Sequence, residues 1–232
     1  MSKLAKAVAA ITGTEPVRRV GRPPLQRAGE VEERILEAAR KVFIERGFEG
    51  ASMDQIAETA RAGKPTIYAR FLNKEALFIA TVENSIAVKN ERLRGHKPGG
   101  ATVEERLSSI GEAMLRETLT ADFIGLYRVV LAEARRLPGL VTRLGQLARE
   151  RGIDTVATLL AEATECCGRG SAPPDAASCE TAAGAFADLI LLPLLMRALS
   201  GENLEALHGE IDAHVAQRVA FFLAACRRGG VV

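Results

Sequence analysis

The chain has 232 residues, of which 47% are hydrophobic, 26% are charged and 4% are aromatic, with no tryptophan. It is long enough for one large core, or for a small domain joined to a larger one, and the composition is typical of a soluble helical protein. The formal net charge is +2, with 14 Lys or Arg against 10 Asp or Glu in residues 1–80 and 17 against 19 in the remainder. The excess positive charge therefore lies in the N-terminal third, where it favours a polyanionic partner.

Several classes of protein are disfavoured. The chain has three histidines and lacks a nucleophile–base motif, a phosphate-binding glycine loop and an HExxH motif, which argues against an enzyme. The most apolar stretch, residues 182–199, is interrupted by Asp188, Pro193 and Arg197, which predicts a buried helix and no membrane span. We expect no cofactor, no metal and no membrane contact, and the lack of a leader-like apolar run predicts a cytoplasmic location.

The cysteines show no metal-ligand spacing, and two of them are adjacent and cannot form an ordinary loop-closing disulfide. They are Cys166, Cys167, Cys179 and Cys226. Reduced thiols of a cytoplasmic protein are the simple interpretation. The alternative is a redox sensor, which needs a thiol with a lowered pKa, and Arg169 is placed to support one.

Residues 1–28 lack helical periodicity and predict a basic, disordered arm. Its charge is concentrated at Arg18, Arg19 and Arg22. One interpretation is a solvated tail. The other is an arm that contacts DNA, because Gly21-Arg22-Pro23 resembles the core of minor-groove AT-hook peptides, and arms beside helix-turn-helix domains enter the minor groove.

Apolar periodicity predicts a first helix over residues 30–46 that stops at Gly47. Ser52 followed by Gln55 is a capping box that starts a second helix, and Pro65 suits the first turn of a third. In the third helix Ile67 and Phe71, four residues apart, are assigned to the core. The side chains left for its outer face are Lys64, Thr66, Tyr68 and Arg70. Two short helices around a tight turn, with a basic and polar outer face, predict a helix-turn-helix.

Asn73 is placed to cap a fourth helix, Thr102 with Glu105 to cap a fifth, and Thr120 to start a sixth that reaches Leu137. The last three predicted helices are a long one over residues 140–167, one capped by Asp175 and one opened by Asn203. No repeat, strand-like alternation or coiled-coil heptad appears. The pattern predicts an all-α fold of nine helices in two domains that join within the fourth helix.

Residues 66–78 resemble the signature of the TetR/AcrR family of bacterial repressors, in which Thr-Leu/Ile-Tyr-x-x-Phe is followed by Asn/Ser-Lys-Glu-x-Leu. The likeness covers about residues 30–80, and residues 126–138 resemble the C-terminal domain of the AefR-like branch. Two positions depart from the family. Arg61 stands where a turn glycine is usual, and Gly63 where a Ser or Thr cap is usual. Either Arg61 accepts the backbone angles of the turn, or Gly63 supplies the permissive position.

The resemblance implies that Lys64, Pro65 and Thr66 face the bases of a DNA major groove. The residues implied to bind phosphates are Ser52, Tyr68, Arg70 and Lys74. For Tyr68 the alternative is packing against the first helix. Because one such helix reads few base pairs, a homodimer on a palindromic double-stranded operator is expected.

The family's dimer forms through its last two helices, and its effector binds in a cavity among helices four to eight. The candidate interface residues are Leu189, Leu192, Leu195, Val215, Val219, Phe222 and Leu223. The candidate cavity residues are Met114, Phe123, Tyr127, Leu159, Phe186 and Ile190, with Arg128 and Glu133 as further polar contacts. For both sets the alternative is ordinary monomer core.

The sequence thus predicts an arm over residues 1–28, a helix-turn-helix DNA-binding domain over 29–75, and a ligand-binding and dimerisation domain over 76–232. The expected function is a DNA-binding transcriptional regulator, a repressor released by a small and largely apolar effector. The alternatives are a helical ligand carrier or adaptor without DNA binding, and a thiol-based redox regulator.

Overall fold

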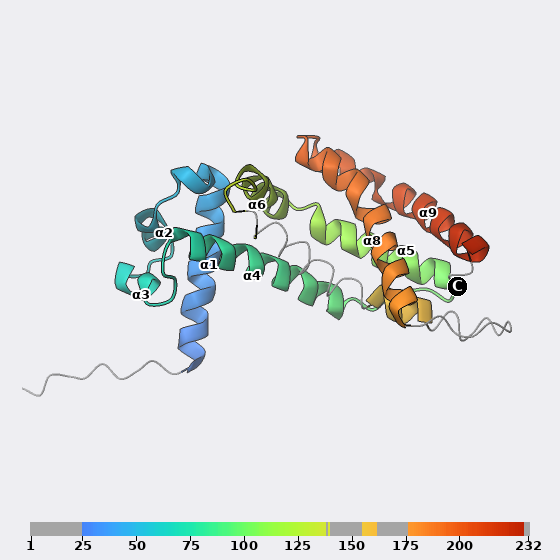
Figure 1. Ribbon diagram of the computed structural model, residues 1–232, viewed down its shortest axis with the longest axis horizontal. Helices are drawn as coiled ribbons and strands as arrows, with labels where there is room; N and C mark the ends of the chain where they lie inside the picture. Colours follow the sequence, from blue (N-terminus) through green and yellow to red (C-terminus); the bar gives the residue numbers. More distant parts are fainter. Residues whose placement is uncertain (1–24, 138, 140–154, 162–175, 230–232) are drawn as a thin grey trace, which may run out of the picture.

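The computed structural model describes residues 25–137, 139, 155–161 and 176–229, and in this part of the chain every regular element is a helix (Figure 1). The labelled helices are α1 (Leu25–Gly50), α2 (Met53–Thr59), α3 (Lys64–Tyr68), α4 (Lys74–Gly95), α5 (Val103–Thr118), α6 (Ala121–Ala132), α8 (Ala176–Leu199) and α9 (Leu204–Gly229). Residues 155–161 are also helical. The molecule is elongated, with α1–α3 at one end, α5, α8 and α9 at the other, and α4 running between them (Figure 1). The all-helical prediction is confirmed.

Three predictions fall wholly or partly outside the described residues. The predicted helix over residues 140–167 is described only over 155–161. The Asp175 cap and the arm residues Arg18, Arg19 and Arg22 lie outside them as well.

Four helices begin at local capping signals. The capping boxes of Ser52 with Gln55 and of Thr102 with Glu105 are both formed, and the side chains of Asn73 and Thr120 also cap their helices. Each side-chain oxygen accepts a hydrogen bond from a backbone N–H that the first helical turn leaves without a partner. These four helix starts are confirmed.

Three helix ends differ from the prediction. α3 ends at Tyr68, so the predicted inclusion of Arg70 and Phe71 in the third helix is wrong. α1 begins at Leu25, before the predicted residue 30, and is interrupted as expected at Gly47, whose φ of 69° and ψ of 177° suit only glycine. α6 ends at Ala132, so the predicted extension to Leu137 is wrong. Residues 133–136 form turns instead, because the Glu133 carbonyl accepts from the N–H groups of Arg136 and Leu137 at 2.9 and 2.8 Å.

The core consists of two clusters, and both α4 and α6 contribute to each of them. The first joins α1–α4 to one side of α6 and is centred on Phe43, Phe48 and Phe78, with the Phe78 centroid 4.9 and 5.1 Å from those of Phe43 and Phe48. The second joins α5, α8, α9 and the helical segment 155–161 to the other side of α6. Phe123 of α6 packs against both clusters. α6 therefore links the helix-turn-helix end of the molecule to its C-terminal helices.

α6 also lies very close to α1. A Cβ added at Gly125 would lie 2.9 Å from Cγ2 of Ile44, so only glycine permits this approach. Ion pairs between Arg40 and Asp122, and between Arg136 and Glu49, tie α6 and the turn after it to α1. A displacement of α6 would therefore also displace the residues of α1 that contact it.

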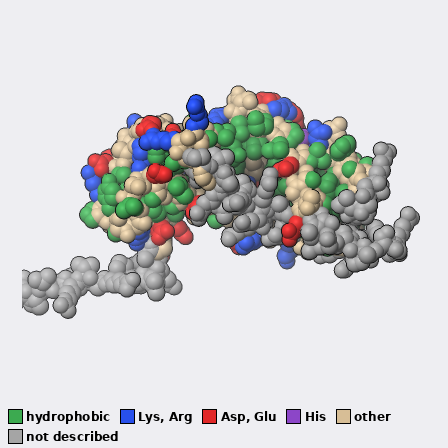
Figure 2. Space-filling view, in the orientation of Figure 1, with side chains coloured by type: hydrophobic (Ala, Val, Ile, Leu, Met, Phe, Trp, Pro, Cys, Tyr) green, Lys and Arg blue, Asp and Glu red, His purple; other side chains and the backbone are tan. Residues whose placement is uncertain are grey.

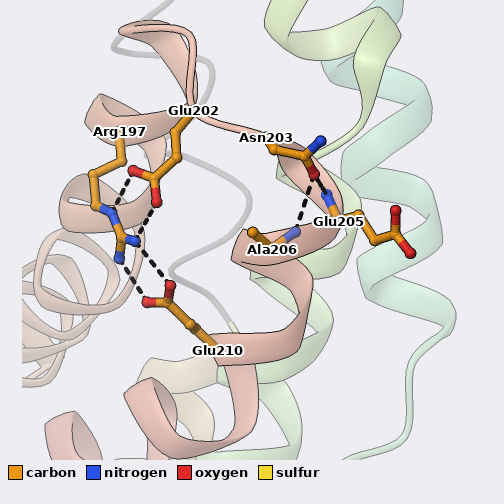
Figure 3. A network of polar contacts seen from close by, with 6 residues as sticks. All are labelled: Arg197, Glu202, Asn203, Glu205, Ala206 and Glu210. Carbon is orange, nitrogen blue, oxygen red and sulfur yellow. Dashed lines mark hydrogen bonds and ion pairs between the residues drawn. The ribbon is translucent and has the colours of Figure 1, made fainter.

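The turn between α8 and α9 is held by a polar network (Figure 3). The Arg197 guanidinium of α8 donates to the carboxylates of Glu202 and Glu210, with donor–acceptor distances of 2.6 and 2.8 Å to the two oxygens of Glu210. These bonds lower the pKa of both carboxyl groups. Asn203 caps α9 as predicted, since its Oδ1 accepts from the N–H groups of Glu205 and Ala206 at 2.8 and 3.1 Å.

Part of the apolar surface of α8 is not covered by the rest of the protomer. Within the described ranges one stretch, Cys179–Leu199, is long and apolar enough by length and composition to cross a membrane, and 33% of its most apolar window is buried. Leu192 and Met196 are among its exposed side chains. The prediction of a buried helix therefore holds for one face of α8 only.

Candidate nucleic-acid interface and effector region

The turn between α2 and α3 is closed by a Schellman motif. The N–H of Ala62 donates to the carbonyl of Ala57, and the N–H of Arg61 to that of Glu58, both at 3.0 Å. Arg61 takes the left-handed position that this motif requires, with φ of 49°. Gly63 has φ of −67° and ψ of 142°, which any residue accepts. Of the two possibilities left open by the sequence, the structure selects Arg61.

α3 presents the predicted outer face to solvent. Ile67 and Phe71 are buried, as assigned. Pro65 is exposed, Thr66 is half-buried, and the Tyr68 side chain is 52% exposed, so Tyr68 is not packed away against α1. Lys64 is exposed and its Nζ lies 2.7 Å from Oδ2 of Asp54 on α2. Lys64, Pro65 and Thr66 thus stand at the N-terminal end of α3, and Tyr68 at its C-terminal end.

Two of the predicted phosphate contacts are engaged within the protein. Nη1 of Arg70 donates to the Thr66 carbonyl at 3.3 Å, and its Nε lies 3.9 Å from Oε2 of Glu32 on α1. The Lys74 ammonium donates to the carbonyls of Phe48, Glu49 and Ala51 at 2.7, 3.3 and 3.0 Å. It also lies 4.6 Å from the centroid of the Phe48 ring. Lys74 thus holds the end of α1 beside α4, a role that the sequence did not indicate.

The candidate interface residues of α8 and α9 divide into two groups. Val215, Val219 and Phe222 are buried in the second core of the protomer. This agrees with the alternative interpretation that they are ordinary monomer core. Leu189, Leu195 and Leu223 are partly buried, and Leu192 is exposed. Figure 2 shows hydrophobic side chains gathered over the part of the surface where α8 lies. The most exposed apolar side chains on these helices include two that the sequence analysis missed, Met196 and Phe221.

Four candidate cavity residues are part of the second core. Met114, Leu159, Phe186 and Ile190 are all at most 4% exposed. The other two, Phe123 and Tyr127, are partly buried and stack with ring centroids 5.9 Å apart.

The two further polar candidates have structural roles. Arg128 donates from Nη2 to the Ala198 carbonyl at 2.7 Å and from Nε to the Leu199 carbonyl at 3.2 Å, so it caps the C-terminal end of α8. Glu133 ends α6.

Phe123 lines an open groove of about 320 Å³ at the junction of α1, α4, α5 and α6. The other lining residues are Glu33, Leu36, Glu37, Arg40, Asn84, Ser85, Val88, Lys89, Arg92, Glu117, Thr120 and Asp122. Burial lowers the pKa of Lys89 to about 8, and nearby Glu117 acts in the opposite direction. No sequence pattern indicates this groove, because its walls come from four separate helices.

The two cysteines within the described ranges, Cys179 and Cys226, are both free and buried. Burial raises the pKa of Cys226, the opposite of what a reactive sensor thiol needs. Cys166 and Cys167 lie outside the described residues. No group of three or more His, Cys, Asp or Glu side chains that would suit a metal ion occurs in the part of the chain that the structure describes.

Comparison with known proteins is consistent with this geometry. Residues 35–81 match the profile of bacterial regulatory proteins of the tetR family, and residues 105–228 match the C-terminal domain of AefR-like transcriptional repressors. The HTH-type transcriptional regulator UidR of Escherichia coli (strain K12) is 32% identical over 115 residues, which are 48% of this chain and 55% of UidR. The match thus spans about half the length of that relative.

Solved structures share the fold over most of the chain. A TetR-family regulator from Mesorhizobium loti superposes with a TM-score of 0.69 at 23% identity, covering 84% of this chain and 98% of that one. The flavonoid-responsive regulator FrrA superposes with a TM-score of 0.58 at 29% identity, covering 85% and 97%. The matched proteins are transcriptional regulators and not enzymes. With its matched helix-turn-helix and more than half of its length matched by an AefR-like domain, the chain belongs to the TetR family of transcriptional regulators.

Proposed function

We propose that this regulator binds a palindromic operator as a homodimer, represses transcription there, and is released by a small-molecule effector. The observation that carries the DNA-binding part is the exposure of Lys64 and Pro65 at the start of α3 and of Tyr68 at its end. The buried side chains of Ile67 and Phe71 hold this segment on the core. Repression is supported by the match to AefR-like repressors.

Lys64 is proposed to read guanine O6 or N7, Pro65 to contact a thymine methyl group, and Thr66 to contact either base or phosphate. Lys64 must first leave Asp54, a small cost because both side chains are more than half exposed. Ser52, Tyr68 and Arg70 are proposed to bind phosphates. The ammonium of Lys74 would have to give up three carbonyl partners to do the same, so we assign it the weakest role.

The dimer is proposed to form through α8 and α9, whose most exposed large apolar side chains are Leu192, Met196 and Phe221, at 48%, 57% and 65%. A partner helix pair would cover them, whereas Arg197 and Asp188 on the same α8 are unsuited to lipid. Phe221→Glu is expected to shift the protein to monomers in sedimentation or light-scattering measurements. Leu131→Glu is the matched control, since Leu131 is a 44% exposed apolar residue on α6. Equal effects of the two changes would place the interface elsewhere.

The effector is proposed to be small and largely apolar, as the flavonoid-responsive FrrA indicates for a protein of similar fold. To release DNA it must bind the released state more tightly than the DNA-bound state. A hundredfold difference corresponds to about 2.7 kcal/mol. α6 is well placed to transmit such a change, because it contacts both cores and is tied to α1.

The decisive experiment is selection of bound sequences from a random duplex pool by the purified protein at near-physiological salt. We expect a palindrome with half-sites about one helical turn apart, and an affinity that falls steeply with salt. No enriched motif together with no salt-dependent shift would refute operator binding. Truncation before Leu25 then tests the arm, since an unchanged salt slope would remove Arg18, Arg19 and Arg22 from the interface.

A further inference from the structure

Among the cations that line the groove beside Phe123, Lys89 is the one without an ion pair to the described residues. No carboxylate in the described ranges lies within ion-pair distance of its Nζ, and no oxygen there accepts a hydrogen bond from it. The ammonium lies instead 4.6 Å from the centroid of the Phe123 ring. A desolvated lysine that is still mostly protonated at neutral pH costs stability. Such uncompensated groups are concentrated at binding sites.

The other charged residues of the groove are paired, apart from the exposed Glu33. Asp122 pairs with Arg40, Glu117 with Arg92 at 3.3 Å, and Glu37 with Lys41 at 3.0 Å. An anion entering the groove would therefore meet one cation available for pairing, close to an aromatic face. The apolar surface beside it comes from Phe123, from the exposed Val88 and from Leu36 at the base.

We propose that this groove binds a small amphipathic carboxylate, whose carboxylate group pairs with Lys89 and whose aromatic or aliphatic body lies against Phe123 and Val88. The volume of about 320 Å³ is at the lower end of the range for small-molecule sites. The pair with Lys89 would add compensation for a charge that, among the described residues, is offset only by Glu117 beyond ion-pair distance. The bound body would exclude water from the face of the Phe123 ring.

A ligand in this groove would touch α1 as well as α4 and α6. Glu33, Leu36 and Arg40 belong to α1, and Lys89 and Phe123 belong to α4 and α6. The Arg40–Asp122 ion pair crosses the same groove. Occupancy would change the position of α1 relative to α6 and hence the affinity for DNA. This regulatory consequence rests on the proposed function, whereas the binding does not.

The test is calorimetric titration of the full-length protein at pH 7 with sodium benzoate and sodium octanoate, and with benzamide as the uncharged match to benzoate. We expect at least one carboxylate to bind with Kd below ~1 mM, and benzamide at least tenfold more weakly. Lys89→Met should weaken carboxylate binding at least tenfold, and Val88→Trp should abolish it by filling the groove. Lys97→Met, at an exposed position after α4, is the matched control and should bind as the wild type does.

Circular dichroism and thermal denaturation establish that each variant is folded. Binding of neither carboxylate, or equal binding by Lys89→Met and wild type, would overturn the site. Lys89-dependent binding that leaves operator affinity unchanged would overturn its regulatory role alone. If the protein binds no DNA, the proposed function fails, and the titration still decides whether the groove binds carboxylates.

Discussion

The backbone of Arg61 offers a direct test of how the helix-turn-helix is built. Among the described residues Arg61 is the one non-glycine residue with positive φ, at 49°. The left-handed conformation costs an L-residue roughly 1–2 kcal/mol, and glycine in exchange loses about 0.5–1 kcal/mol more chain entropy on folding. Arg61→Gly should therefore stabilise the protein by about 0.5–1 kcal/mol. For a chain of this length that is a rise in Tm of about 1–4 °C.

A control variant separates the effect of the backbone conformation on stability from the effect of the Arg61 charge. Arg61 lines a second hollow together with Arg34 and Lys41, so its removal also relieves repulsion between like charges. Arg61→Ala removes the same charge but keeps Cβ, so it should stabilise the protein less than Arg61→Gly does. Gly63→Ala should be close to neutral, because its φ is −67° and the nearest atoms to an added Cβ lie 3.7 Å away.

The assay is thermal and urea denaturation of the wild type and the three variants. Hydrogen exchange then shows whether any gain in stability lies in α2 and α3. The reasoning fails if Arg61→Gly is no more stable than Arg61→Ala. It fails equally if Gly63→Ala costs more than ~1 kcal/mol, since that would place the turn's glycine requirement at residue 63.

Three further predictions concern DNA reading, α1 and the groove. Lys64→Ala should lose about 1–3 kcal/mol of operator affinity and relax specificity at one base position, whereas Arg70→Ala should weaken all sequences alike; repeating the sequence selection with each variant distinguishes them. Gly47→Ala should destabilise the protein by roughly 1–3 kcal/mol in urea denaturation, because φ of 69° with ψ of 177° is accessible only to glycine. Lys89→Met should raise stability at pH 7, because burial lowers the pKa of Lys89 from 10.5 to about 8 and disfavours its protonated form in the folded state. This gain should shrink as the pH rises above 8 and vanish above 10.5, and a gain independent of pH would contradict the assigned cause.

Local sequence signals determined the DNA-binding end of the protein. The capping box of Ser52 and Gln55, the position of Pro65 and the four-residue spacing of Ile67 and Phe71 each act over only a few residues. Their effect does not depend on the rest of the chain, so the sequence alone predicts both helices and the outer face of α3.

The C-terminal helices show where this reasoning stops. Apolar spacing marks a helix face that will be covered, but it does not say whether the same chain or a partner covers it. Val215 and Phe222 were predicted at an interface and lie in the protomer core, whereas Phe221, one residue away, is exposed. Only the packing of α5 and α8 against α9 decides between neighbouring positions.

The tertiary structure also decided the roles of individual charges. The sequence predicts that Lys74 binds a phosphate. In the structure its ammonium already donates hydrogen bonds to three carbonyls at the end of α1. Lys89 has no sequence signal, because its environment is made by residues of four helices. Helix starts and faces depend on neighbours a few residues away, which the sequence displays. Burial and charge pairing depend on segments brought together only by folding. For this protein they determine which side chains remain available for the proposed contacts with DNA, with a second subunit and with an effector.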